Sequence, residues 1–224
     1  MPMHPMEHSA YLALRENATV LEADGSGDKV LLLEDGTILK LFRRKRLISS
    51  ALLFPYAQRF ADNIDALKKR GIPCPDVIAT YRIASISRDA VRYTPLPGLT
   101  IRQVLKEHGE SAPLRAELGI FIAHLHDRGV YFRSLHMGNV VLTPTNELGL
   151  IDIADLRCQK LALSDSKRLR NFAHLLRYEQ DKQWLLGSDQ GAAFLQGYTQ
   201  GMPTDRQSTM TERLQLLLTA PIDR

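Results

Sequence analysis

The sequence contains only two cysteines and no long apolar run. Cys74 and Cys158 are far apart and belong to no CxxC pattern. This spacing argues against a disulfide framework, and a structural zinc site would need more ligands. No run approaches the roughly 18 apolar residues of a membrane-spanning helix. Residues 1–18 lack the apolar core of a signal peptide, so we expect a cytoplasmic protein with a loose N-terminal start.

The charge is mildly basic, with 29 Lys and Arg against 25 Asp and Glu. Two clusters carry much of it, at residues 43–46 (RRKR) and 68–70 (KKR). Two interpretations stay open: solvated surface, or contact with an anionic partner such as a phosphorylated lipid or a membrane surface. Aromatic residues do not interleave with the charge and no nucleic-acid motif accompanies it, so we expect no nucleic acid partner.

Residues 18–42 have the pattern of three strands. From residue 19 to residue 42 the sequence reads TVLEADGSGDKVLLLEDGTILKLF. A glycine turn containing Gly25 and Gly27 separates the first two apolar runs. Asp35-Gly36 separates the second from the third and predicts a tight hairpin in which both turn residues have positive φ. Lys40 lies inside the third apolar run. Its side chain would occupy either the wet face of the sheet or a cleft.

Helical periodicity appears once in the β-rich half and dominates the rest. Residues 50–70 place Phe60, Ile64 and Leu67 on one stripe, and residues 113–128 form a second amphipathic helix. Two short strands around a turn follow near residues 140–153, and then more helices. We therefore predict an α+β fold with two lobes. Its parts are an N-terminal extension (1–17), a β-rich N-lobe with one helix (18–97) and a mainly helical C-lobe (98–224).

Four polar features stand out against this background: the Gly25-Ser26-Gly27 turn, Lys40, Asn139 and Asp152. Each has an ordinary explanation when taken alone. A G-x-G turn is commonly only a turn, a strand lysine is commonly solvated, and an Asn after Gly caps many turns. Asp152 is more informative, because it ends an apolar strand and a buried carboxylate needs a partner.

Together these features resemble the protein kinase-like superfamily. Its catalytic loop reads H-R-D-L-x-x-x-N, or H-x-D-L-H-x-x-N in small-molecule members, and residues 132–139 here read FRSLHMGN. Leu135, His136, Gly138 and Asn139 match this loop, and Asp152 in LIDIAD matches the aspartate that binds metal. The YTPLPG segment resembles the hinge between lobes. Within the superfamily, the sequence is most similar to bacterial lipopolysaccharide core kinases that act on Kdo or heptose.

The resemblance implies ATP and Mg²⁺ as cofactors. Lys40 would hold nucleotide phosphates, and the backbone at Gly25 and Gly27 would offset phosphate charge. Asn139 and Asp152 would supply oxygen ligands to Mg²⁺. The partner would be the lipopolysaccharide core or another anionic glycolipid, met through peripheral contact with the inner membrane.

The sequence departs from the family at three places. Ser134 occupies the position of the catalytic aspartate, and a neutral serine cannot act as a carboxylate base at neutral pH. Phe132 replaces the usual histidine. No glutamate occurs between Lys40 and Gly71 to pair with the lysine, and Asp62 is a substitute that we consider.

We therefore predict Ser134, His136 and Asp152 as catalytic residues. His136 and Asp155 are candidates to replace the missing base, although each also has a simple structural explanation as a loop hydrogen bond or a cap. Three functions remain open. They are a divergent ATP-dependent kinase of a lipopolysaccharide core sugar, a pseudokinase that binds nucleotide or a partner enzyme, and a small-molecule kinase of the aminoglycoside or choline type.

Overall fold

The computed structural model describes residues 2–25, 27–44 and 55–221, and these residues form a mixed α+β structure. The chain divides into two compact units, Met1–Leu96 with Ile151–Asp155, and Pro97–Leu150 with Leu156–Arg224. Strands dominate the first and helices the second, in the order that the sequence predicts. The predicted α+β class is therefore confirmed.

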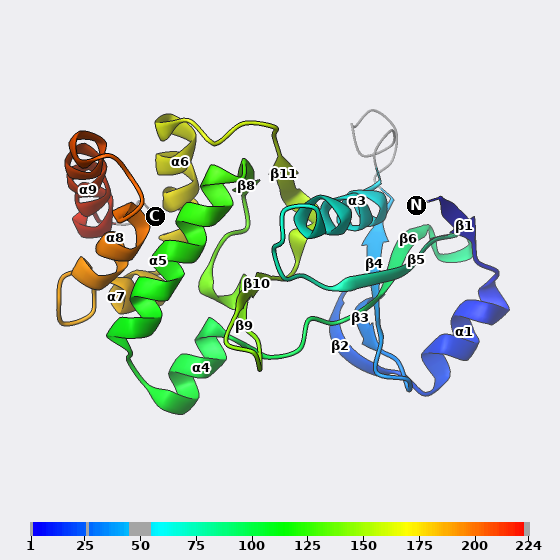
Figure 1. Cartoon of the computed structure of the whole chain (residues 1–224). Helices are drawn as coiled ribbons and strands as arrows, with labels where there is room; N and C mark the ends of the chain where they lie inside the picture. The colour runs from blue at the N-terminus through cyan, green and yellow to red at the C-terminus, as the bar shows by residue number, and fades with distance from the viewer. Residues whose placement is uncertain (1, 26, 45–54, 222–224) are drawn as a thin grey trace. The chain divides into compact units, whose positions relative to one another are not determined.

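The first unit is built on a six-stranded sheet with strand order β1-β5-β6-β4-β3-β2 (Figure 1). All neighbouring strands pair antiparallel except β1 and β5, which are parallel. Its elements are β1 (Met3–Pro5), α1 (His8–Glu16), β2 (Thr19–Asp24), β3 (Gly27–Leu32), β4 (Ile38–Arg43), α3 (Tyr56–Lys68), β5 (Asp76–Ile83), η1 (Ala84–Ile86), β6 (Arg88–Thr94) and η3 (Ile153–Asp155).

The N-terminal residues are ordered, and the predicted loose start is wrong. β1 adds a strand beside β5, and the Met6 amide donates to the Arg82 carbonyl. Tyr11 of α1 is buried against an apolar cluster that contains Leu31, Leu39 and Leu41. Burying this tyrosine and covering a sheet edge stabilise a segment whose prolines and mixed polarity suggested none of this structure.

Strand alternation explains why the sheet is covered on both faces. Leu39 and Leu41 of β4 belong to the cluster beneath α1, and the residues between them point to the other face. On that face α3 packs through Phe60, whose ring lies 5.0 Å from that of Tyr93. The predicted stripe of Phe60, Ile64 and Leu67 is confirmed as fully buried. Residues 45–54, which include the start of the helix predicted over residues 50–70, lie outside the described part of the chain.

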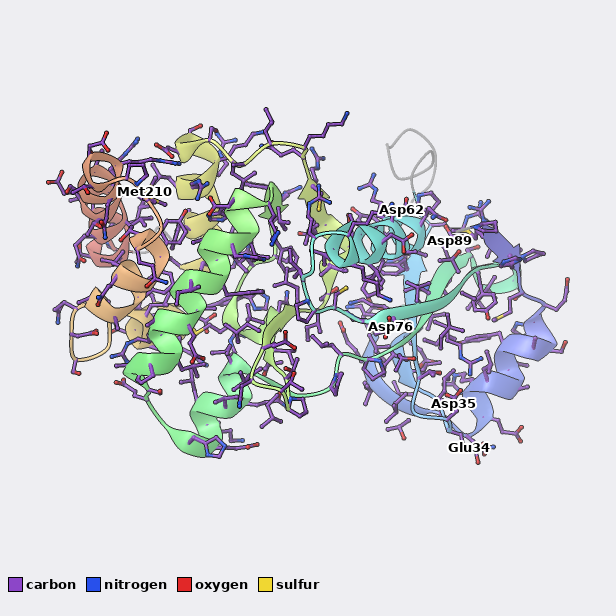
Figure 2. The ribbon with its side chains drawn as sticks, viewed as in Figure 1. Glu34, Asp35, Asp62, Asp76, Asp89 and Met210 are labelled. Atoms are coloured by element: carbon purple, nitrogen blue, oxygen red, sulfur yellow. The ribbon has the colours of Figure 1, made fainter. Side chains whose placement is uncertain are left out.

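The hairpin between β3 and β4 forms, but with a different turn from the one predicted. Gly36 has a φ of 77°, and Asp35 keeps an ordinary negative φ. The Gly36 amide donates to the Leu33 carbonyl, and Asp35 instead accepts from the backbone and hydroxyl of Thr37. Figure 2 labels Asp35 and Glu34 at this turn. The longer loop therefore needs only one left-handed residue, and that residue is glycine.

The second unit is mainly helical and carries two small sheets, β10-β9-β7 and β11-β8. Its elements are β7 (Leu99–Thr100), α4 (Ile101–His108), α5 (Ala112–Asp127), β8 (Val130–Phe132), η2 (Met137–Asn139), β9 (Val140–Leu142), β10 (Leu148–Leu150), β11 (Leu156–Cys158), α6 (Asp165–Leu175), α7 (Glu179–Leu186), α8 (Ala192–Thr199) and α9 (Thr204–Thr219).

Helices α5 and α8 form the centre of the second unit (Figure 1). They meet at two glycines, because a Cβ on Gly119 would overlap the Phe194 carbonyl and one on Gly197 would overlap the Ala116 carbonyl. This close backbone contact fixes α5. The loop after α5 and β8 is consequently held at one end by the core of the unit.

Candidate functional site

Lys40 lies in the middle of β4, where it pairs with Val30 on one side and Val91 on the other. Its neighbours Leu39 and Leu41 are buried in the cluster on the opposite face. Alternation therefore places Lys40 on the face that α3 covers. The Lys40 side chain is only 16% exposed, so the sequence alternative of a fully solvated lysine does not hold.

Lys40 forms an ion pair with Asp152 inside the first unit. The distance from Lys40 Nζ to Asp152 Oδ1 is 2.5 Å. The Asp152 side chain is 49% exposed, so its carboxylate remains accessible to solvent and to a cation. The structure thus brings together two of the predicted site residues that are 112 positions apart in the sequence.

Asp152 has a strained backbone, with a φ of 54° in the left-handed region. Aspartate tolerates this region better than most residues, yet the conformation still requires support from its surroundings. Asn63 of α3 provides it, because its side-chain amide donates to the Ile153 carbonyl at 2.7 Å. Strain of this kind is concentrated at functional sites in proteins.

The predicted substitute for the missing helix glutamate is not confirmed. Asp62 on α3 (Figure 2) accepts a hydrogen bond from Gln58 one turn earlier, at 2.7 Å. The lysine pairs with Asp152 instead. Asn63, the next residue, is the one that connects α3 to the segment around Asp152. No sequence pattern predicts this role of Asn63, because a single asparagine on a helix is common.

Gly25 and Gly27 lie at the tip of the β2–β3 hairpin, with Ser26 outside the described residues. Register pairs Asp24 with Gly27, so the connection is short, and Gly27 has a φ of 104° that favours glycine. The acidic residues at this tip have cationic partners. Asp28 pairs with Arg15 at 2.5 Å, and Lys29 lies 3.5 Å from Asp24. These pairs offset the negative charge that would otherwise oppose a phosphate.

The loop at residues 131–139 is anchored from within by Asn139. Its side-chain Nδ2 donates to the Ser134 carbonyl at 2.9 Å, and the residue is nearly buried. This contact uses a donor of the side chain and does not involve Oδ1, which is its hydrogen-bond acceptor. Leu135 and Met137 are fully buried on either side of His136 and fix the loop to the core.

His136 has its Nδ1 committed to the loop, because it accepts from the Gly138 amide at 3.1 Å. A neutral imidazole with an accepting Nδ1 carries its proton on Nε2. The edge of the ring contacts Tyr178, with 5.2 Å between the ring centroids. In this tautomer Nε2 carries the proton and is a potential hydrogen-bond donor. Ser134 is half-buried and offers a hydroxyl but no carboxylate.

A buried carboxylate that sequence reasoning missed supports the same loop. Asp181 of α7 has a fully buried side chain and accepts from the Met137 amide at 3.1 Å. Arg102 of α4 donates to both Asp181 oxygens at 2.9 Å and lies 4.6 Å from the centre of the Tyr178 ring. A Cβ on Gly138 would lie 3.2 Å from this guanidinium. A side chain at this position would therefore need the ends of Arg102 and His136 to shift by a few tenths of an ångström.

A second group that sequence reasoning missed, Asn171 of α6, holds β8, the strand that leads into the loop. Its side chain donates to the Phe132 carbonyl at 2.6 Å and accepts from the Phe132 amide at 3.3 Å. His126 of α5 contacts Asn171 Oδ1 at 3.2 Å and the Tyr198 hydroxyl at 2.8 Å. Complete burial, together with the nearby charge of Arg168, lowers the pKa of His126 to about 3.

In the first unit, the pKa of Tyr93 is also raised. Burial raises the pKa of Tyr93 well above its usual range, and the negative charge of Asp152 raises it further. Tyr93 therefore stays a neutral phenol beside the pair of Lys40 and Asp152. Asp155, proposed from sequence as a replacement base, closes η3 and is half-buried. Its catalytic role stays a prediction.

Comparison with known proteins gives similarity in structure only. No protein-family model matches the sequence, and no curated protein matches it either. One similar solved structure is monomeric WbdD, with 15% identity and a TM-score of 0.48. That similarity covers 92% of this chain and 46% of WbdD, so this chain spans about half of the WbdD chain.

A second similar structure is described as a divergent kinase that lacks the glycine-rich loop and regulates membrane ultrastructure of the Toxoplasma parasitophorous vacuole. It has 13% identity and a TM-score of 0.49, over 97% of this chain and 80% of that one. At these scores we draw no functional statement from either protein.

We predict that Asp181 holds the backbone of the loop at residues 131–139 in place. Replacing it in D181A removes the acceptor for the Met137 amide and leaves Arg102 without its partner. Loss of a hydrogen bond to a charged group predicts about tenfold faster amide hydrogen exchange in residues 133–139. The control is D205A, which removes an exposed aspartate on α9. Equal exchange of the loop in both variants would contradict this role.

We predict that His126 makes the second unit less stable in acid. Its pKa is lower in the folded chain than the unfolded value of about 6.5, so the unfolded state binds the proton first. Its stabilising contribution is present above about pH 6.5 and is lost as the pH falls toward its folded pKa. Urea unfolding followed by the single tryptophan, Trp184, measures this effect.

In H126Q the free energy of unfolding should fall less steeply between pH 6 and pH 4. The difference in slope should approach about 1 kcal/mol per pH unit, within the limit of about 1.4 for one proton. H108Q, at an exposed histidine, serves as the control for replacing an imidazole. Parallel curves for the wild type and H126Q would contradict the prediction.

Proposed function

We propose that this protein is a divergent ATP-dependent phosphotransferase whose acceptor is a lipopolysaccharide core sugar. The observation that carries the proposal is the ion pair between Lys40 and a strained, half-exposed Asp152. A lysine beside a carboxylate that remains accessible is suited to hold nucleotide phosphates together with their metal ion.

The donor set fits Mg²⁺. Asp152 offers a half-exposed carboxylate, and Asn139 keeps its Oδ1 because Nδ2 is bound to Ser134. Within the described residues there is no group of three or more His, Cys, Asp or Glu placed to hold a metal. Mg²⁺ commonly uses one or two protein oxygens and completes its shell with phosphate and water. The metal would neutralise charge on the phosphates.

Chain connectivity supports the use of both ligands. β9 begins directly after Asn139, and β10 ends two residues before Asp152. The register pairs Val140 with Leu150, the first residue of β9 with the last of β10. We propose that Asn139 and Asp152 serve one metal, and that Gly25, Gly27 and Lys40 serve the phosphates.

The acceptor hydroxyl must lose a proton during transfer, and the protein lacks the carboxylate base that would accept it. Ser134 has no carboxylate, and the Nδ1 of His136 already accepts from Gly138. General base catalysis contributes roughly 10²–10⁴-fold, while positioning and electrostatic stabilisation contribute more. We therefore propose a slow enzyme, in which His136 donates from Nε2 to an anionic oxygen.

An anionic glycolipid acceptor is proposed from the charge. Arg43 and Arg44 are exposed at the end of β4, while Lys45 and Arg46 of the same cluster lie outside the described residues. The second cluster is partly engaged, since Lys68 pairs with Asp76 and Arg70 donates to the Ala66 carbonyl. No helix among the described residues is long and apolar enough to cross a membrane. Peripheral contact with the inner membrane remains a proposal.

A second candidate function is a pseudokinase, which binds nucleotide or a partner enzyme without phosphoryl transfer. Two observations favour it: the serine at position 134, and the commitment of His136 to the loop backbone. The same residues that would hold ATP in an enzyme would hold it in a sensor. Nucleotide binding and turnover therefore have to be measured separately.

We predict Mg²⁺-dependent binding of a non-hydrolysable ATP analogue, measured by titration calorimetry. D152N should weaken binding at least tenfold, because it removes the charge that faces the metal and Lys40. D76N is the matched control, since Asp76 (Figure 2) also pairs with a lysine in the first unit but is exposed at the start of β5. Absence of binding by the unmodified protein would overturn the phosphotransferase proposal and leave only a pseudokinase that binds a partner enzyme.

We predict that S134D raises the rate of ADP formation about 10²-fold with a lipopolysaccharide core acceptor, because it restores a carboxylate base. S134A changes the same side chain without adding a base and should give no gain. If S134D still binds nucleotide but forms no ADP, the phosphotransferase proposal fails and the pseudokinase is favoured.

A further inference from the structure

The second unit contains a cationic pocket that the proposed roles do not use. It is a cavity of about 580 Å³, within the usual size of a small-ligand site. Its charged and aromatic lining residues are Tyr131, Arg133, Arg157, Lys167, Arg170 and His174. No aspartate or glutamate lines it among the described residues. The pocket therefore gathers positive charge without a carboxylate to balance it.

Two strands and one helix direct these side chains into the same space. The register of β8 and β11 places Arg157 opposite Tyr131. Arg133 lies in the turn directly after β8 and also lines the cavity. On α6, Lys167, Arg170 and His174 recur at intervals of three and four, which is one face of a helix.

A direct contact joins the helix face to the strand face. The Tyr131 hydroxyl lies 3.2 Å from His174 Nε2, and the two rings meet edge to face at 6.0 Å. This contact places α6 against β8 from within the second unit. Arg157 on β11 and the cations of α6 are therefore held in place by secondary structure.

The cations of the pocket differ from four other arginines of the unit. Arg102, Arg115, Arg168 and Arg206 each pair with a carboxylate. In the described part of the second unit, no ion pair involves Arg133, Arg157 or Arg170. Lys167 donates to the neutral Gln159 side chain at 2.6 Å. Several like charges brought together repel one another, and an anion removes this repulsion.

We propose that this pocket binds a phosphate or carboxylate group carried by the acceptor sugar. The proposal rests on the proposed function, because Arg133 directly precedes Ser134, where that function places the acceptor hydroxyl. Guanidinium groups bind phosphate and carboxylate through paired hydrogen bonds, which gives orientation as well as affinity. The pocket would select acceptors that already carry an anionic group and would turn their hydroxyl toward the loop.

The pocket contains its own chemical reporter, Cys158. The chain has only one other cysteine, Cys74, which is buried in the first unit. Burial raises the pKa of Cys74 to about 11, so its thiol reacts slowly. Cys158 is half-exposed and lines the cavity. Its alkylation by iodoacetamide, followed by peptide mass spectrometry, therefore reports on occupancy without nucleotide or turnover.

The probes are glucose 6-phosphate, glucose and inorganic phosphate, at low salt where charge is least screened. We expect glucose 6-phosphate to slow alkylation of Cys158 and glucose to leave the rate unchanged. R157Q and R170Q should each require about tenfold more glucose 6-phosphate for the same protection. R213Q removes an exposed arginine from α9, outside the pocket, and should behave as the unmodified protein does.

Other results would overturn the inference. No protection by millimolar glucose 6-phosphate, or equal loss in R213Q, would show that the pocket is not an anion site. Protection by inorganic phosphate at the same concentration would remove the assignment to the acceptor sugar. Protection only by vesicles of phosphatidylglycerol would assign the charge to a membrane surface.

This test fails separately from the proposed function. If the protein binds no nucleotide but glucose 6-phosphate still protects Cys158 in a pattern that depends on Arg157 and Arg170, the anion site stands and the proposed function fails. If nucleotide binds and no protection occurs, the reverse holds. Circular dichroism of each variant verifies that the replaced, exposed arginines leave the fold unchanged.

Discussion

The ion pair between Lys40 and Asp152 is the interaction on which the first unit's polar site depends. A lysine in the middle of an apolar strand is favourable only if its charge has a partner or reaches water. Alternation on β4 buries Leu39 and Leu41 on one face and leaves Lys40 on the other. Asp152 meets it there at 2.5 Å, and Asn63 supports the strained segment that follows. Sheet, helix and left-handed aspartate thus act together.

In the second unit, polar side chains hold the backbone of the loop at residues 131–139 in place. Asn139 binds the Ser134 carbonyl, His136 binds the Gly138 amide, and Asp181 binds the Met137 amide. Each of these contacts uses one atom and thereby decides what the rest of the side chain can do. In Asn139 the contact uses the donor Nδ2, whereas in His136 it uses the acceptor Nδ1. The chemistry of the loop follows from how the loop is held.

Local pattern predicted much of this structure. Alternating apolar residues and glycine turns marked β2, β3 and β4, and helical spacing marked α3 and α5, because these signals act over a few residues. The left-handed φ predicted for Asp35 was wrong, since the loop was longer than two residues and only Gly36 needed it. The N-terminal strand and helix were missed, because their stability comes from the sheet beneath them.

Long-range polar partners were not predictable in this way. Arg102 and Asp181 are 79 residues apart, and Asn63 and Ile153 are 90 apart. Nothing near either residue in the sequence indicates its partner. Lys40, Asn139 and Asp152 were identified because they resemble a known motif. The residues that position them depend on tertiary packing, which a single sequence does not report.

A crystal structure of the protein grown with a non-hydrolysable ATP analogue and Mg²⁺ tests the central claim most directly. We expect a metal ion with oxygen ligands from Asp152 and Asn139 at about 2.0–2.1 Å, and Lys40 beside the phosphates. A nucleotide bound elsewhere, or a metal that contacts neither residue, would contradict the claim.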